Sequence, residues 1–309
     1  MRNRPLTIRS IAKAAGVSPT TAFRALNDEQ LVERLSESSQ VLCVVNSRRQ
    51  AQQLYSLLKL KEGTFHLSTL MTPYDRKRVL QIIRTRLKDS DPCRVISTSL
   101  IEAGVDVDFP VVWRAIAGLD SIIQTGGRCN REGKRTLEDS VVHIFRSEAK
   151  APRMLEQNIA ATERVLRQHT QIDSPEAIHD YFQFLFYTLK DSHQLDEKDI
   201  LRDVKKLMFE TVAKQFRMID GADYTIYIPI DEGEVLIRKL HDEGPSRQLL
   251  RSLGQYSVSV YRQYFDQLNV SGRLEQITDT AGILIDTGFY SRETGLPFTV
   301  SEQDRLLLV

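Results

Sequence analysis

Five short apolar runs that alternate with helix-like segments most constrain what this chain can fold into. Such near-continuous apolar runs are typical of strands buried on both faces of a parallel sheet. The segments between them place apolar residues at helical spacing, as Ala51, Leu54 and Leu58 do. Strands and helices in this alternation predict an α/β fold with a parallel, doubly wound sheet. The expected strands are Val41–Val45, Phe65–Leu70, Arg94–Ser97, Pro110–Ile116 and Asp139–Phe145.

Ligands of open parallel sheets bind at the carboxyl ends of the strands. Polar loops follow two of the expected strands there, one after Val45 and one after Ser97. We therefore expect these two loops to belong to the functional site.

A second constraint is the spacing Gln-x-x-Gly-Arg-x-x-Arg, which Gln124, Gly127, Arg128 and Arg131 supply. In a helical turn, residues spaced three and four apart share one face. Arginine grips phosphate with two hydrogen bonds and is always charged. An arginine beside a transferring phosphoryl group raises the rate by roughly 10³–10⁵. The alternative is a solvated basic loop that closes an ordinary α/β crossover.

The motifs Ser97–Asp106 and Gln124–Arg131, in this order, resemble the last two signature motifs of superfamily two helicases. Across residues 31–147, the wording V-V-N-S-R-R-x-A, S-T-S-L-I-E-A-G-V-D-V-D-F and Q-T-G-G-R-C-N-R-E-G is most similar to the helicase-nuclease of type I CRISPR systems. The resemblance implies the second RecA-like lobe of an ATP-driven DNA translocase. A superfamily two RNA helicase is a weaker match.

The resemblance implies a cofactor, partners and three groups of functional residues. ATP would be the cofactor, with Mg²⁺ held by a missing first lobe. Single-stranded DNA, a lobe with a phosphate-binding (Walker) loop in another chain, and the CRISPR effector complex would be partners. The expected catalytic residues are Gln124, Arg128 and Arg131; the ATP cleft residues are Glu102, Gly104, Asp106 and Gly127; the DNA-binding residues are Asn46, Ser47, Arg48, Arg49, Ser97, Thr98 and Ser99.

Residues 1–27 differ in character, because they hold five basic residues and no acid. Their sequence predicts two short helices around a turn at Gly16, with Ser18 capping the second helix and Pro19 at its first position. This segment resembles the helix-turn-helix of lactose-repressor-family regulators, in which the second helix enters the major groove. The resemblance implies DNA contacts by Ser18, Thr20, Thr21 and Arg24; a helical pair used only for packing is the alternative.

Beyond the expected lobe at 28–150, the composition shifts. Residues 151–170 predict a polar connector helix, and 171–309 a helix-rich α+β accessory domain. Within it, we expect one helix over 199–216. The layout is similar to the C-terminal domain that follows the lobes in the same helicase family. The fold class is therefore a RecA-like parallel-sheet lobe between a helix-turn-helix-like segment and this domain.

Composition excludes some classes. The 309 residues have a hydrophobic content of 41% and a net charge of +1, so a DNA-binding surface would have to be a local patch. No apolar run approaches the roughly 20 residues that span a bilayer. Three widely spaced cysteines indicate reduced thiols and a cytoplasmic location. The His179-Asp180 and His241-Asp242 pairs lack partners at metal-ligand spacing, so no metal site is expected.

The chain has no phosphate-binding loop: Gly133-Lys134 is followed by Arg135 instead of Ser or Thr. Asp196–Asp199 spells the helicase carboxylate box but follows no buried strand. We therefore expect the isolated chain neither to hydrolyse ATP nor to unwind DNA. DNA-stimulated ATP turnover that is lost in Arg128→Ala would contradict this expectation.

Three hypotheses about function follow. The chain is a partial helicase lobe, a sequence-specific regulator led by residues 6–27, or an inactive product that folds but binds nothing tightly. Regulator binding would prefer one duplex sequence and would collapse when Thr20, Thr21 and Arg24 become alanine. Lobe binding to single strands would be indifferent to those changes.

Overall fold

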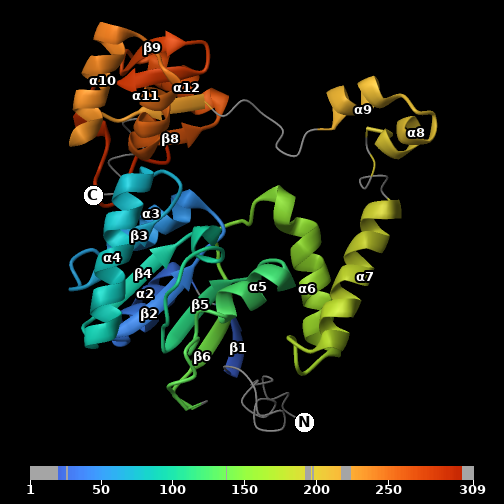
Figure 1. Ribbon diagram of the computed structural model, residues 1–309. Coiled ribbons are helices and arrows are strands. Elements are labelled where there is room, and N and C mark those ends of the chain that lie inside the picture. Colours follow the sequence, from blue (N-terminus) through green and yellow to red (C-terminus); the bar gives the residue numbers. More distant parts are fainter. Residues whose placement is uncertain are drawn as a thin grey trace.

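The computed structural model describes residues 27–136, 138–191, 196, 198–216 and 224–300, together with the backbone of Thr20–Ala25; for 189–191 only the backbone is described. Figure 1 shows three parts: a lobe built on a large sheet, an arm of helices, and a C-terminal domain above the lobe.

The sheet of the lobe is parallel throughout, with the strand order β1-β6-β5-β2-β4-β3. The five strands expected from the apolar runs are all present, so the prediction of a parallel α/β sheet is confirmed. The bounds are β1 (Thr20–Ala25), β2 (Gln40–Val44), β3 (Thr64–Leu67), β4 (Cys93–Ser97), β5 (Val111–Ala115) and β6 (Val141–Arg146).

Helices cover both faces of this sheet, as a doubly wound fold requires. Leu31 and Leu54 pack with β2 on one face, and Val79 and Ile83 pack with β2 and β4 on the other. Local capping sets where the helices begin: the side chains of Ser47 and Thr72 each accept a backbone N–H of the first turn. The helices of the lobe are α2 (Asp28–Glu37), α3 (Arg48–Leu58), α4 (Pro73–Asp89), η1 (Ser99–Ile101) and α5 (Leu119–Gly126).

The helical arm begins with η2 (Arg153–Leu155), α6 (Glu156–Gln168) and α7 (Pro175–Asp191). Tyr181 of α7 is fully buried against α5 and α6, and its hydroxyl donates to the Asp120 carboxylate at 2.9 Å. This contact ties the arm to the lobe.

The prediction of a single helix over 199–216 is wrong. The segment forms two short helices, α8 (Ile200–Lys205) and α9 (Phe209–Gln215). Between them, Leu207 has a φ of +59°, a left-handed conformation that a continuous α-helix excludes. The chain turns there instead of continuing.

The C-terminal domain packs helices on a four-stranded sheet of order β8-β7-β10-β9, in which only the β7–β10 pair is parallel. Leu70, which follows β3 in the lobe, lies in the core of this domain with Phe265 and Leu296. The elements are β7 (Tyr224–Tyr227), α10 (Glu232–Glu243), α11 (Arg247–Leu253), η4 (Gly254–Tyr256), β8 (Ser257–Val260), α12 (Arg262–Val270), β9 (Leu274–Thr278), β10 (Ala281–Leu284) and η5 (Thr287–Phe289).

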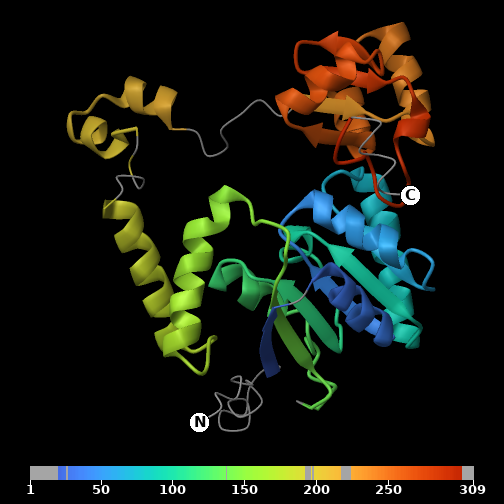
Figure 2. The same cartoon turned by 180° about the vertical axis from the view of Figure 1, so that it is seen from behind.

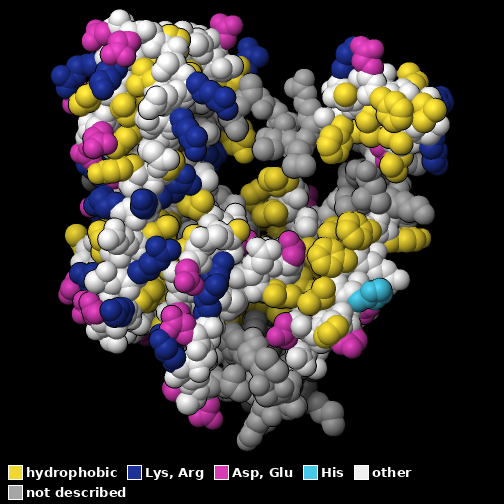
Figure 3. Space-filling model, in the orientation of Figure 1, with side chains coloured by type: hydrophobic (Ala, Val, Ile, Leu, Met, Phe, Trp, Pro, Cys, Tyr) yellow, Lys and Arg dark blue, Asp and Glu magenta, His cyan; other side chains and the backbone are white. Residues whose placement is uncertain are grey.

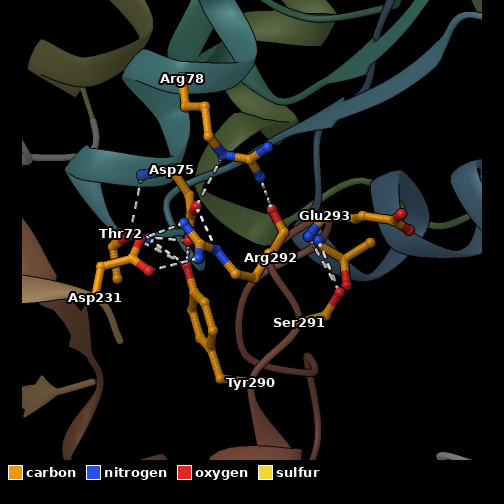
Figure 4. Close-up of polar contacts among 9 residues, drawn as sticks. Thr72, Asp75, Arg78, Asp231, Tyr290, Ser291, Arg292 and Glu293 are labelled. Carbon is orange, nitrogen blue, oxygen red and sulfur yellow. Dashed lines mark hydrogen bonds and ion pairs between the residues drawn. The ribbon is translucent and has the colours of Figure 1, made fainter. Parts of the chain in front are cut away.

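Residues 290–298, called here the docking segment, fasten the C-terminal domain to the lobe. Asp75, fully buried at the start of α4, accepts from the Tyr290 hydroxyl at 2.8 Å and from Arg292 Nε at 3.1 Å. Arg292 also forms two hydrogen bonds with Asp231 of the C-terminal domain (Figure 4). Gln52 of α3 adds bonds to the carbonyls of Thr294 and Leu296. The two parts therefore share a polar, largely buried interface.

The prediction of a recognition helix is wrong for Thr20–Ala25, the part of it that the structure describes. Thr20–Ala25 is a β-strand that pairs in parallel with β6 at the edge of the sheet (Figure 2). Because β6 would otherwise present unpaired backbone groups, a run with β-branched and aromatic residues satisfies them better as a strand. Thr20, Thr21 and Arg24 are thus on a strand and not on a helix, while Ser18 lies outside the described residues.

Candidate functional site at the carboxyl edge of the sheet

Arg114, at the carboxyl end of β5, connects three loops of the candidate site although its side chain is only 2% exposed. Its guanidinium donates to Asn46 Oδ1 at 2.7 Å and to Ser121 Oγ at 2.8 Å, and it forms an ion pair with Glu102 Oε1 at 3.1 Å. Burial lowers the pKa of Arg114, and the Glu102 carboxylate opposes that effect. The pair holds the loop after β2, the loop after β4 and the start of α5 in one network.

Glu102 connects this hydrogen-bond network to Arg128. The Glu102 carboxylate also accepts from the Ser121 and Thr125 hydroxyls. Its backbone carbonyl accepts from Arg128 Nη2 at 2.5 Å, and the carbonyl of Ile101 accepts from Arg128 Nε at 3.1 Å. Arg128 is 8% exposed, and its pKa is lowered first by burial and then by Arg131. Arg128 is therefore held by the backbone of the Glu102 loop.

Most of the remaining residues expected at the ATP cleft are more exposed to solvent than Arg128. Arg131 forms an ion pair with Asp106 at 2.9 Å, with both side chains exposed. Gln124, Gly104 and Gly127 are exposed as well. Gly104 has a φ of +71°, which only glycine adopts without strain. The structure thus brings Glu102, Asp106, Arg128 and Arg131 together around one loop.

The loop after β2 lies between the sheet edge and the C-terminal domain. Asn46 is fixed by Arg114 and by its own bond to the Ile116 carbonyl at 2.7 Å. Arg48 lies 5.1 Å from the ring centre of Tyr261, and Arg49 lies 5.1 Å from that of Phe298. Both expected DNA-binding arginines therefore face aromatic rings of the C-terminal domain, a contact that no sequence motif predicts.

The loop after β4 is less accessible than expected. Ser97 is fully buried and donates to the Leu67 carbonyl, and Thr98 is 8% exposed, whereas Ser99 is exposed. Of the three expected contacts, Ser99 has the side chain that is open to solvent.

A pocket of about 290 Å³ opens at the carboxyl ends of β2, β5 and β6. Asn46, Ser47 and Lys150 line it, together with Gln50, which is 3% exposed and donates to Ser147 Oγ. Arg146 and the carboxylate of Glu148 line the same pocket. Its two cationic side chains, its amides and the amino end of α3 favour a phosphate group, whereas Glu148 opposes one.

Lysine and arginine side chains gather over the lobe and the C-terminal domain in Figure 3, whereas the helical arm shows mainly apolar side chains. Phe186, Tyr187 and Phe209 are each more than half exposed there. In the described part of the chain, no group of three His, Cys, Asp or Glu side chains is placed to hold a metal ion. Asp180 instead pairs with His169.

No helix within the described ranges is long and apolar enough to cross a membrane. All three cysteines are free and buried, and Cys43 and Cys93 lie in the core of the lobe.

The fold and this site define the class of the lobe: a RecA-like α/β unit with helicase motifs at the carboxyl edge of its sheet. Residues 37–134 match the family described as CRISPR-associated nuclease/helicase Cas3, C-terminal. The resemblance to the C-terminal part of a type I Cas3 helicase is thereby supported by the sequence, and two relatives extend it.

Both relatives are CRISPR-associated nuclease/helicases Cas3. The protein of Methanothermobacter thermautotrophicus is 25% identical over 264 residues, which cover 81% of this chain and 30% of the relative. The protein of Haloferax volcanii is 49% identical over 65 residues, which cover 21% of this chain and 7% of the relative. The chain thus spans less than a third of the length of either relative.

Solved structures agree on the fold. The crystal structure of T. fusca Cas3-ATP has a TM-score of 0.60 at 11% identity, covering 88% of this chain and 40% of that chain. A CRISPR RNA-guided surveillance complex, pre-nicking, has a TM-score of 0.54 at 13% identity, covering 86% and 41%. These identities support the shared architecture alone.

Two features of the site were not predicted from the sequence. Arg114 sits inside an apolar strand pattern, and a charged residue in a buried strand is itself a signal for a buried partner. Tyr261 and Phe298 carry no motif, because only the docking of the C-terminal domain brings them beside the loop after β2.

Proposed function

We propose that this chain is the second motor lobe and accessory domain of an ATP-driven translocase on single-stranded DNA in CRISPR defence. The observation that carries the proposal is the network from Asn46 through Arg114 and Glu102 to Arg128. It connects a loop expected at DNA with a loop expected at ATP by direct hydrogen bonds and one ion pair.

Single-stranded DNA would lie along the carboxyl edge of the sheet, held mainly through its phosphates. The polar pocket at Asn46, Ser47 and Lys150 supports this position, as does the amino end of α3. Binding of this kind releases counterions and is therefore sensitive to salt and tolerant of sequence.

The chain would supply arginine to an ATP site whose phosphate loop and Mg²⁺ ligands belong to a first lobe. Arg128 fits this role in part. Its Nε and Nη2 donate hydrogen bonds to backbone carbonyls, whereas Nη1 has no hydrogen-bond partner among the described residues and could donate to a phosphate. Arg131 would have to leave Asp106, a pair that costs little to break because both side chains are exposed. In a complete site, such arginines stabilise the charge that develops during phosphoryl transfer.

Fluorescence anisotropy of a labelled dT20 oligonucleotide tests the DNA part of the proposal. We expect saturable binding whose logarithmic affinity falls linearly with the logarithm of salt concentration. Lys150→Ala should weaken binding and reduce that slope by about 0.7, the value for one lost phosphate contact on a single strand.

Arg34→Ala is the matched control. Arg34 lies in the last turn of α2, just before β2 begins, and so at the opposite edge of the sheet. Its loss should leave both affinity and slope unchanged. No binding of dT20 at low salt, or equal losses in the two variants, would overturn the proposal.

A further inference from the structure

A second pocket, of about 270 Å³, lies at the junction of the lobe and the C-terminal domain. From the lobe, Arg48 and Leu70 line it; from the C-terminal domain, Tyr261, Gln263 and Gln267 do so, with Phe298 of the docking segment. None of these C-terminal residues belongs to a helicase motif. The pocket adjoins the loop expected to hold the DNA backbone but is separate from the polar pocket at β2, β5 and β6.

One aromatic side chain of this pocket, Tyr261, is open to a ligand. Tyr261 is 73% exposed, although it lies directly before α12, and the Arg48 guanidinium stands over its ring at 5.1 Å. The neighbouring Tyr264 is fixed, because its hydroxyl donates to the Pro297 carbonyl at 2.7 Å. An exposed tyrosine contributes little to the domain core, whereas its free face is a stacking platform for another planar group.

Two amides complete the polar lining. Gln263 and Gln267 are four residues apart on α12 and therefore on one face of the helix. Both are exposed, and neither side chain forms a hydrogen bond within the described part of the chain. Each amide offers both a donor and an acceptor, the combination displayed by the edge of a nucleobase.

We propose that this pocket takes one unstacked base of the single strand whose phosphates lie over the Asn46–Arg49 loop. The inference rests on the proposed function and adds base contact to phosphate contact. Base–aromatic stacking tolerates any sequence, because every base has a π face. A base is favoured over an apolar peptide group because the mouth of the pocket is formed by a guanidinium and two amides.

Anisotropy with two labelled 20-mers tests the inference: dT20, and a strand of the same length in which abasic tetrahydrofuran units replace all thymidines. The wild-type chain should bind dT20 at least about fivefold more tightly than the abasic strand, the lower end of what one stacked base contributes. Tyr261→Ala should reduce dT20 affinity to that of the abasic strand while leaving the affinity for the abasic strand unchanged. Tyr261→Phe should retain the preference, since the ring is kept.

Tyr187→Ala is the matched control, because Tyr187 is 65% exposed on α7, far from this junction, and its loss should not alter the preference. Equal wild-type affinity for the two strands would overturn the base pocket and leave the proposed function intact. A preference that survives Tyr261→Ala in full would overturn it as well. Failure of both strands to bind at low salt would instead refute the proposed function, and the base pocket with it.

Discussion

Arg114 shows how much of the candidate site depends on one buried charge. It lies in a strand whose other side chains are apolar, and it holds Asn46, Ser121 and Glu102 at once. A buried guanidinium is tolerated only when it is paired and hydrogen-bonded, and Arg114 satisfies both conditions apart from its Nε. The spacing of the helicase motifs therefore predicts which loops meet, but not the residue that joins them.

Replacing Arg114 tests this role. In Arg114→Met the Glu102 carboxylate, whose side chain is 10% exposed, loses its ionic partner. We expect a loss of about 3–5 kcal/mol in the free energy of unfolding, the usual result of leaving one buried charge unpaired. Denaturant unfolding measures it. The double variant Arg114→Met/Glu102→Gln should recover part of that loss, and a single-variant loss below about 1 kcal/mol would show that the pair is not needed.

His66 gives the lobe a predicted sensitivity to acid. It is 1% exposed, and burial lowers its pKa to about 3, against about 6.5 in an unfolded chain. Between these values the unfolded state binds the proton and the folded state does not. Stability is therefore fully present above pH 6.5 and is lost as pH falls toward 3, by up to about 1.4 kcal/mol per pH unit.

Denaturant unfolding between pH 7 and pH 4 checks this dependence, with His66→Gln as the comparison. Glutamine does not titrate in this range, so the variant should start less stable but lose less on acidification. Parallel pH profiles for the two proteins would exclude His66 as the source.

At the scale of elements, five of the six strands of the lobe were predictable because each contains a run of mostly apolar residues. Strand β1 was not, because its segment was expected to be helical. The C-terminal domain was predicted less completely. Its sequence pattern indicates strands over Tyr224–Pro229, Gln255–Val260 and Ala281–Ile285 and a helix over Arg247–Leu253, where β7, β8, β10 and α11 lie. Helices α10 and α12 and strand β9 were not anticipated. Strand β9 has one buried residue in five, so its sequence carries no apolar run. The break at Leu207 was missed because nothing in the local sequence marks a left-handed residue there.

The docking segment depends on a close approach of its backbone at Gly295 to the backbone of Leu70, which its sequence does not predict. Gly295 has a φ of +78°, and a Cβ at this position would lie 2.0 Å from the Leu70 carbonyl oxygen. Gly244 has nearly the same φ, +77°, but nothing within 4 Å of the corresponding point. The two glycines thus separate backbone strain from steric contact.

Gly295→Ala should therefore lower the free energy of unfolding well beyond Gly244→Ala. The control carries only the backbone cost of a non-glycine residue at a φ of +77° and a ψ of 177°, roughly 1–3 kcal/mol, whereas Gly295→Ala must also displace the docking segment from Leu70. Denaturant unfolding compares them, and hydrogen exchange should show increased opening at 290–298 in Gly295→Ala alone. Equal losses would mean that the close approach is not maintained.

For the whole molecule, the sequence predicted the class of the lobe and the grouping of Glu102, Asp106, Arg128 and Arg131. It did not predict that the C-terminal domain would place Tyr261 and Phe298 against Arg48 and Arg49, because that contact arises from tertiary docking alone. It was wrong about a helix at Thr20–Ala25, where pairing with β6 overrides the local pattern. The expected roles in ATP and DNA binding remain predictions.

Under the proposed function, single-stranded DNA lies along the carboxyl edge of the sheet and beside the C-terminal domain. Hydrogen–deuterium exchange with and without saturating dT20 locates the bound strand. We expect slower exchange in residues 46–50 and 98–102 and around 261–267, with no change in α2 at the opposite edge. Protection confined to other surfaces, with these three segments unchanged at saturation, would contradict it.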